Sequence, residues 1–190
     1  MPRLPRSFQS GLVYHVINRG NGQAEVFHKP QDYEAFLDLL AAAKRRTPVR
    51  LFAFCLMPNH FHLVVEPEAS QDLSRFMQWL LTSHVRRYHR HYEGSGHVWQ
   101  GRFKSFPIQR DEHLLTVLRY VRQNPVRASL VSTESEWSWS SANRHDLIDR
   151  PPVDDYRCDE ALSVGQLREL RECLNRQHPF GSEEWRRTLR

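Results

Sequence analysis

Two runs of strand-forming residues, joined by a very short connection, constrain the fold of this chain most strongly. Residues 49–57 and 60–66 are rich in apolar and β-branched or aromatic side chains, which is typical of buried strands. The connection Met57-Pro58-Asn59 is short enough for a hairpin. The two runs therefore predict neighbouring antiparallel strands.

Further strands and helices alternate around this hairpin. Strands are expected at residues 13–18 and 103–109, the first stopped by a turn rich in Gly and Asn. Helical spacing of apolar residues predicts three helices: residues 31–46, a long helix capped by Ser70, and a helix from Asp111 to about Asn124 that Pro125 ends. The order βαββαβα predicts an α+β fold, a ferredoxin-like antiparallel sheet with helices on one face.

The C-terminal part of the chain has a different pattern. The Pro151-Pro152 linker leads to Ser163-Val164-Gly165-Gln166, a capping box that precedes apolar residues at helical spacing. We therefore expect a first domain at residues 1–130 and a small C-terminal helical appendage at residues 131–190.

Composition narrows the class of protein. The chain has 190 residues, and its 39% of hydrophobic residues gather in periodic segments, which argues against disorder. It contains no apolar run of about 18 residues and no signal-peptide pattern, so we expect a cytoplasmic protein with no membrane partner. Its three cysteines, Cys55, Cys158 and Cys173, have no C-x-x-C spacing, which argues against a disulfide framework or a cysteine zinc site.

The net charge of +5 is concentrated between residues 84 and 110, where Glu93 is the only acidic residue among many basic ones. Aromatic residues are interleaved with these charges. Because basic groups attract phosphates and flat rings stack on exposed bases, the segment predicts binding to single-stranded or distorted nucleic acid. A merely solvated basic surface is the alternative. The candidate DNA-binding residues are Arg19, Arg86, Arg87, Trp99, Arg102, Phe103 and Lys104.

Two histidines, His60 and His62, lie in phase on the second strand of the predicted hairpin. Side chains alternate across a strand, so these two point the same way, roughly 7 Å apart at their backbones, and can converge on one cation. A single His in such a strand is more commonly a hydrogen-bonded core residue, but a second one in phase favours a metal site. With oxygen ligands and water, the site would suit Mg²⁺ or Mn²⁺, and the imidazoles favour Mn²⁺.

A tyrosine lies at the edge of the apolar stripe on the helix that begins at Asp111. Tyr120 and Asn124 fall together beside the stripe, whereas Gln123 falls away from the core. An ordinary boundary tyrosine is the alternative. If a cation held by the histidines polarises a phosphodiester, Tyr120 could attack phosphorus and form a covalent phosphotyrosine. The amide oxygen of Asn124 could complete the metal shell.

Several motifs, in their order along the chain, resemble the signature series of one family. They are Leu56-Met57-Pro58-Asn59-His60-Phe61-His62-Leu63, Trp99-Gln100-Gly101-Arg102-Phe103-Lys104 and Arg119-Tyr120-Val121-Arg122-Gln123-Asn124-Pro125-Val126-Arg127-Ala128, together with Tyr14-His15-Val16, Arg19-Gly20-Asn21 and Trp137-Ser138-Trp139-Ser140-Ser141. This series is similar to that of the REP-associated tyrosine transposases, in the HUH single-tyrosine transposase superfamily.

The resemblance implies that residues 1–130 are an HUH tyrosine transposase catalytic domain with a divalent metal at His60 and His62. It implies cutting and joining of single-stranded DNA at repetitive extragenic palindromic hairpins of bacteria, through a 5′-phosphotyrosine at Tyr120. The protein would then act at the bacterial nucleoid, and the family favours a monomer. Family members often continue into a basic tail that this sequence lacks; reduced hairpin affinity and a trimmed tail both fit that departure.

Two other classes of function remain open from the sequence. One is a non-catalytic module that binds single-stranded DNA through the same basic, aromatic strip. The other is an RNA-hairpin-binding domain, because an open antiparallel sheet with aromatic residues can stack RNA bases. The combination of Tyr120, Asn124, His60 and His62 favours the enzyme, since binding alone needs no metal pair.

Overall fold

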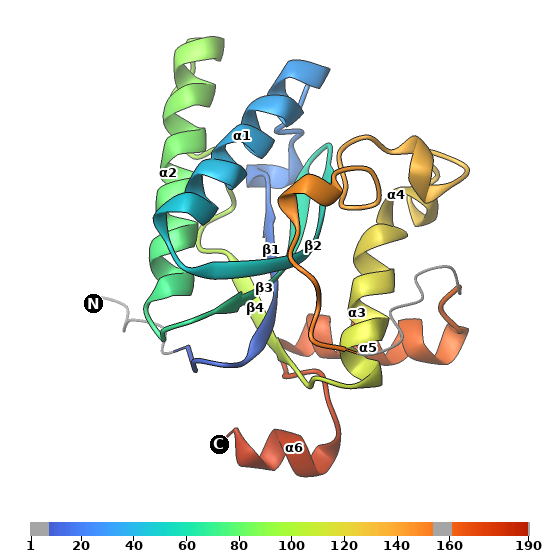
Figure 1. The fold of residues 1–190 in the computed structure, drawn as a ribbon. Coiled ribbons are helices and arrows are strands. Elements are labelled where there is room, and N and C mark those ends of the chain that lie inside the picture. Colours follow the sequence, from blue (N-terminus) through green and yellow to red (C-terminus); the bar gives the residue numbers. More distant parts are fainter. Residues whose placement is uncertain (1–7, 154–160, 190) are drawn as a thin grey trace.

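A four-stranded antiparallel sheet forms the centre of the molecule (Figure 1). The computed structural model describes residues 8–153 and 161–189. In the order β2-β3-β1-β4, the strands are β1 (Val13–Arg19), β2 (Val49–Met57), β3 (His60–Pro67) and β4 (Lys104–Ile108). The α+β class and the ferredoxin-like order of elements are confirmed, and the strand ends move by a residue or so.

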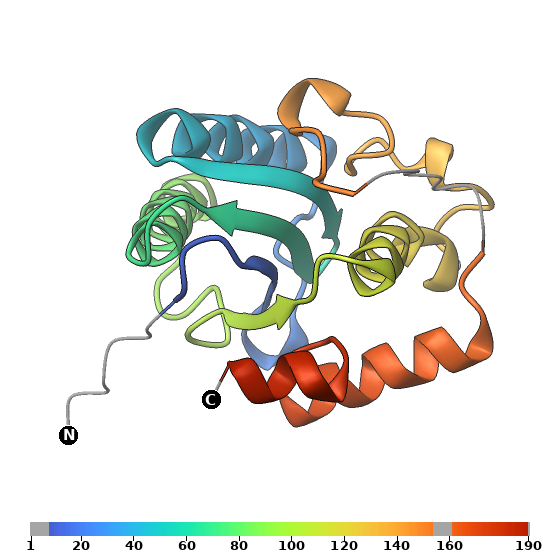
Figure 2. The ribbon, with the colours of Figure 1, turned by 60° about the horizontal axis from the view of Figure 1, so that its bottom comes forward.

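Helices cover both faces of the sheet (Figure 2). One face carries α1 (Pro30–Arg46) and α2 (Asp72–Tyr92), and the other carries α3 (Glu112–Arg122) with α5 (Val164–Arg176) packed beside it. The expected placement of the helices on one face is thus corrected for α3. The remaining elements are η1 (Asn21–Gln23), α4 (Asn124–Arg127), η2 (Glu134–Glu136), η3 (His145–Leu147) and α6 (Glu183–Thr188).

Each face of the sheet has its own hydrophobic core, because side chains alternate along the strands. Phe61, Leu63 and Val65 of β3 are buried with α1 and α2, whereas Val64 is buried with α3. A register shift between Leu51 and Ala53 marks a bulge in β2, which is buried on both sides. His60 and His62 alternate with Phe61 and therefore lie on the α3 face.

The β2–β3 hairpin holds the end of β1 next to the histidines. The carbonyl of Asn59 in the turn accepts a hydrogen bond from the amide of Gly20, with a donor–acceptor distance of 2.7 Å. A Cβ at Gly20 would lie 2.1 Å from the carbonyl oxygen of Ala24, so only glycine fits there. This close approach positions Arg19 beside His60, its partner in the strand register.

Segments that follow residue 130 form hydrogen bonds with both edges of the sheet. Along β2, Leu56 N–H donates to the Trp139 carbonyl and Ser141 N–H donates to Phe54. Along β4, Phe180 N–H donates to Pro107 and its carbonyl accepts from Gln109. The predicted division at residues 130 and 131 remains a prediction, and these contacts tie the second part closely to the first.

Two helix ends differ from the sequence prediction. Gln71 precedes α2 in place of Ser70, no side chain caps the helix, and the carboxylate of Asp72 in the first turn accepts a hydrogen bond from the Ala69 N–H. The helix from Asp111 stops at Arg122, and Pro125 then lies in the first turn of α4, where proline is well tolerated. The capping box of Ser163 and Gln166 is confirmed.

Other expectations concern cysteines and membranes. Cys55 and Cys173 are buried free thiols, and Cys158 lies outside the described residues. Within residues 8–153 and 161–189, no helix has the length and apolar character required to cross a bilayer.

Candidate active site

The structure brings His60, His62 and Tyr120 to one cavity of about 460 Å³ between the sheet and α3. His62 pairs with Ile17 of β1 in the strand register, and His60 pairs with Arg19. The ring centroids of His60 and His62 are 4.9 Å apart, and those of His62 and Tyr120 are 5.8 Å apart. A substrate atom in this cavity could therefore meet both imidazoles and the phenol.

Burial keeps both imidazoles neutral, which is the form that binds metal. Desolvation, with a smaller effect from the Arg19 cation, lowers the pKa of His60 to about 4. Burial and the neighbouring His60 hold the pKa of His62 well below its usual value. His60 Nδ1 lies 2.7 Å from Asn59 Oδ1, so it donates there and leaves Nε2 free as a ligand. The chemistry of this pair fits a divalent cation.

A third histidine, His15, lies behind the pair and is fully buried on β1. Its Nε2 lies 2.9 Å from His62 Nδ1, and burial lowers the pKa of His15 to about 3. Its Nδ1 has no hydrogen-bond partner among the described residues. Such a contact can fix the orientation and tautomer of His62. The sequence did offer a signal, a polar residue between Val13 and Ile17 on one face of an apolar strand.

Tyr120 occupies the boundary of α3, partly buried against the core of that face. The four positions of the predicted stripe are buried: Leu114, Val117, Leu118 and Val121. The guanidinium of Arg127 lies 4.0 Å from the centroid of the Tyr120 ring, and it also donates to the Tyr120 carbonyl. Arg127 comes from α4, so this cation over the phenol depends on the turn between α3 and α4.

Cationic side chains surround the same cavity. Arg19, Arg102 and Lys104, all predicted DNA-binding residues, line it and are exposed. Sequence reasoning missed two further polar residues of the lining, Arg171 and Asn175 on α5. No local pattern distinguishes them from other exposed residues of an amphipathic helix, so only the fold reveals them.

The other predicted DNA-binding residues lie elsewhere. Arg86, Trp99 and Phe103 line a separate groove against α2. Arg87 is partly buried on α2, where its charge acts on His84 and Tyr92. The seven predicted residues are thus divided between the cavity that Tyr120 lines, the groove and the α1–α2 side of the sheet.

Asn124 does not appear among the described residues that line the cavity. It is buried at the start of α4, and its side-chain nitrogen has no partner among the described residues. The prediction for Asn124 used a straight helix, whereas α3 stops at Arg122. Its role as a metal ligand therefore remains a prediction without that geometric support.

A different group of side chains has ligand atoms close together. Among the described residues, Asp111, Glu112 and His113 place theirs within 4.8 Å of one another at the start of α3. However, Asp111 already caps α3 and accepts from His113 Nδ1 at 2.7 Å. These contacts account for the cluster as a helix cap, with Glu112 exposed to solvent.

Solved structures support the fold. The chain has a TM-score of 0.60 and 21% identity to a structure described as a REP-associated tyrosine transposase bound to a REP hairpin, covering 86% of this chain and 100% of that one. The two proteins therefore share this fold.

Sequence comparison places the chain more narrowly. Residues 8–124 match the model of the IS200-like transposases, so the chain belongs to this family. It is 23% identical over 147 residues to the REP-associated tyrosine transposase of Escherichia coli strain K12, covering 77% of this chain and 85% of the relative. The resemblance to REP-associated tyrosine transposases is therefore confirmed.

A second relative, from Haemophilus influenzae, is also named as a REP-associated tyrosine transposase. It is 30% identical over 108 residues, which represent 51% of this chain. The match spans 61% of the length of that relative.

Proposed function

We propose that this chain cuts and rejoins single-stranded DNA at repetitive extragenic palindromic hairpins, through a covalent bond between Tyr120 and a 5′ phosphate. The observation that carries the proposal is the shared cavity, where Tyr120 and two neutral imidazoles lie among exposed cations. Family membership supports the reaction class. Two similar proteins, described as a REP-associated tyrosine transposase and as such a transposase bound to a REP hairpin, support the substrate. Such a substrate is chromosomal, so the protein would act at the nucleoid.

His60 and His62 would hold a divalent cation, Mg²⁺ or Mn²⁺, through their free nitrogens. When bound, the cation would neutralise charge that develops on a non-bridging phosphate oxygen. Asn124 remains a candidate third ligand because its amide oxygen suits these cations. His15, by its contact with His62, would keep that ring in place.

Tyr120 would supply the nucleophile. Its phenol oxygen forms a bond to phosphorus, the bond from phosphorus to the 3′ oxygen breaks, and the phenol proton passes overall to the departing 3′ hydroxyl. A 3′ hydroxyl can reverse this step and rejoin the strand. Arg127 packs on the phenol ring and restrains its position, while Arg19, Arg102 and Lys104 would hold the neighbouring phosphates.

Labelled single-stranded hairpin DNA, incubated with the protein and Mn²⁺ and run on a denaturing gel, tests the proposal. We expect a covalent protein–DNA band that Tyr120→Phe abolishes while hairpin binding persists, because only one hydroxyl is lost. Tyr88→Phe is the matched control, since the Tyr88 hydroxyl bonds to His28 on the other face of the sheet.

Three outcomes of this experiment distinguish the possible functions of the site. A persistent band in Tyr120→Phe contradicts the assigned nucleophile. Binding without any covalent band in the wild type favours a non-catalytic DNA-binding module. Tighter binding of the matching RNA hairpin favours an RNA-binding domain.

A further inference from the structure

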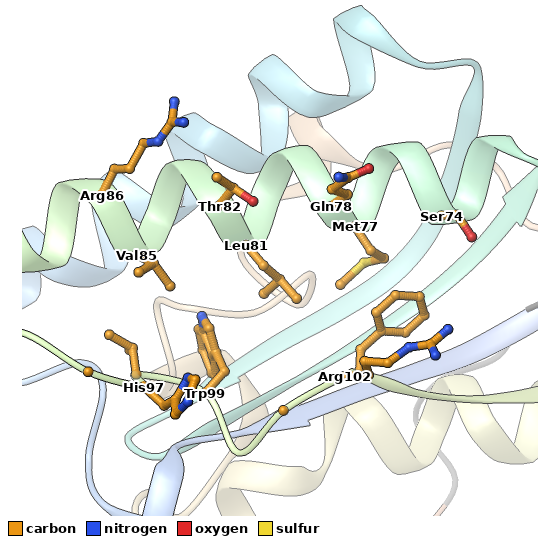
Figure 3. Close-up of a pocket in the computed structure, with 14 residues that line it drawn as sticks. Ser74, Met77, Gln78, Leu81, Thr82, Val85, Arg86, His97, Trp99 and Arg102 are labelled. Carbon is orange, nitrogen blue, oxygen red and sulfur yellow. The ribbon is translucent and has the colours of Figure 1, made fainter. Parts of the chain in front are cut away.

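A groove of about 690 Å³ lies between α2 and the segment 96–103 that leads into β4 (Figure 3). Met77, Leu81 and Val85 project from α2 toward Trp99 on the opposite wall. Arg86 also lines the groove, but its guanidinium points away from Trp99. The side chains of α2 that face Trp99 are therefore apolar, and Ser74, Gln78 and Thr82 add polar groups elsewhere along the groove.

Trp99 contributes an unpaired hydrogen-bond donor to that wall. The residue is only 5% exposed, and its ring packs against Phe61 and His84, with centroids 5.2 and 5.3 Å away. The sequence had suggested that a base stacks on the Trp99 ring. Because neighbouring side chains cover the faces of that ring, such stacking is excluded in this structure. However, the indole N–H has no partner among the described residues, and the nitrogen is turned toward α2. A buried donor without an acceptor costs free energy that a ligand could recover.

The groove and the catalytic cavity lie next to each other, and the segment 100–104 forms the wall between them. Arg102 lines both spaces, while Gln100 and Lys104 line the catalytic cavity and Phe103 lines the groove. Gly101 has a φ of +123°, a conformation that favours glycine and lets the chain bend between the two spaces. One strand of nucleic acid could therefore place its backbone in the first space and a base in the second.

We propose that the groove takes one unpaired nucleobase of the DNA strand whose phosphodiester bond lies in the catalytic cavity. A base has flat apolar faces for Leu81 and Val85, and its edge carries oxygen or nitrogen acceptors for the Trp99 N–H. Because that nitrogen is covered in the unbound protein, a side chain of α2 changes rotamer as the base enters. Arg102, shared by both spaces, holds the intervening phosphate. This inference rests on the proposed function and adds a site for substrate recognition.

An abasic scan tests the groove. The probe is a synthetic, fluorescein-labelled DNA hairpin with oligothymidine arms, in which each arm position is made abasic in turn. Affinity is measured by anisotropy in EDTA, so that no cleavage occurs. For the wild type we expect one position where loss of the base weakens binding about tenfold, the usual order for one recognised base.

Two variants and one control assign that position to the groove. Trp99→Phe removes the donor but keeps an aromatic ring, and Leu81→Trp fills the groove; each should reduce the abasic penalty to less than about twofold. Trp79→Phe makes the same chemical change on α2, where Trp79 packs on Arg46, and should keep the full penalty.

Each other outcome contradicts the inference. A flat scan by a protein that still forms the covalent band refutes the base site but leaves the proposed function intact. A penalty that persists in Trp99→Phe places the base elsewhere, and this variant decides the matter if Leu81→Trp fails to fold. A change in sedimentation of Leu81→Trp with unchanged DNA affinity would make the groove an interface between copies. If the wild type does not bind the labelled hairpin with its single-stranded arms at all, both proposals are refuted.

Discussion

At the scale of single residues, the site depends on two histidines whose nitrogens are directed by their neighbours. His60 donates to Asn59, and His62 contacts His15, so the remaining nitrogens face the cavity. From the sequence alone, strand alternation predicted that His60 and His62 share one face, and the structure places both at the cavity, while their role as metal ligands stays a prediction. It could not predict His15, because that contact depends on which residue of β1 lies beside His62.

We expect His60→Ala combined with His62→Ala to weaken Mn²⁺ binding by about 10- to 100-fold or more, the order found when metal shells are perturbed. Isothermal titration calorimetry measures this directly. His89→Ala with His91→Ala is the control, because it removes two histidines at the same spacing from α2. If the His60/His62 variant binds Mn²⁺ as tightly as the wild type does, the metal site lies elsewhere.

At the scale of elements, the sequence predicted periodicity better than helix ends. The apolar stripe of α3 is buried as expected, and the tyrosine lies at its edge. The break at Gln123 was not predictable from spacing, because Pro125 is equally compatible with the end of one helix and the first turn of another. The cation of Arg127 over Tyr120 is a consequence of that break and was missed with it.

The helix α2 carries a buried histidine that should make stability depend on pH. Burial, with a smaller effect from Arg87, lowers the pKa of His84 to about 4. An unfolded histidine binds a proton below about pH 6.5, so acidification between these values favours the unfolded chain. The melting temperature should therefore fall as pH decreases from about 6.5 to about 4.

His84→Phe should remove the share of this dependence that comes from His84, and Phe27, Phe36 and Trp99, which surround the ring, should accommodate the new side chain. The loss per histidine is at most about 1.4 kcal/mol for each pH unit. Thermal melts at several pH values measure it. An equal slope in His84→Phe and wild type would show that His84 does not titrate as inferred.

At the scale of the whole molecule, the candidate active-site cavity is assembled from distant parts of the chain. Strand β3 supplies the two histidines, β1 supplies Arg19, α3 supplies the tyrosine, and α5 adds Arg171 and Asn175. The order of elements predicted the sheet correctly. It did not show that α3 would lie on the face opposite α1 and α2, nor that α5 would reach the same cavity, because both depend on packing between segments far apart in sequence.

The cations of this cavity should make DNA binding strongly dependent on salt. Arg102→Gln with Lys104→Gln should reduce the slope of log affinity against log salt by about 0.7 for each lost phosphate contact on a single strand. Anisotropy titrations over a range of NaCl concentrations measure the slope. Arg168→Gln with Arg187→Gln removes two exposed cations that pair with Glu172 and Glu183, and should have little effect.

Both edges of the sheet are occupied by later parts of the same chain, Trp139 and Ser141 along β2 and Phe180 along β4. Free edges are the usual starting points for aggregation, because an exposed strand can template a strand from another molecule. The strand β2 is almost entirely apolar, so it would be a strong template if uncovered. Local opening of residues 137–149 would therefore uncover the β2 edge and permit self-association even in molecules whose remaining fold is intact.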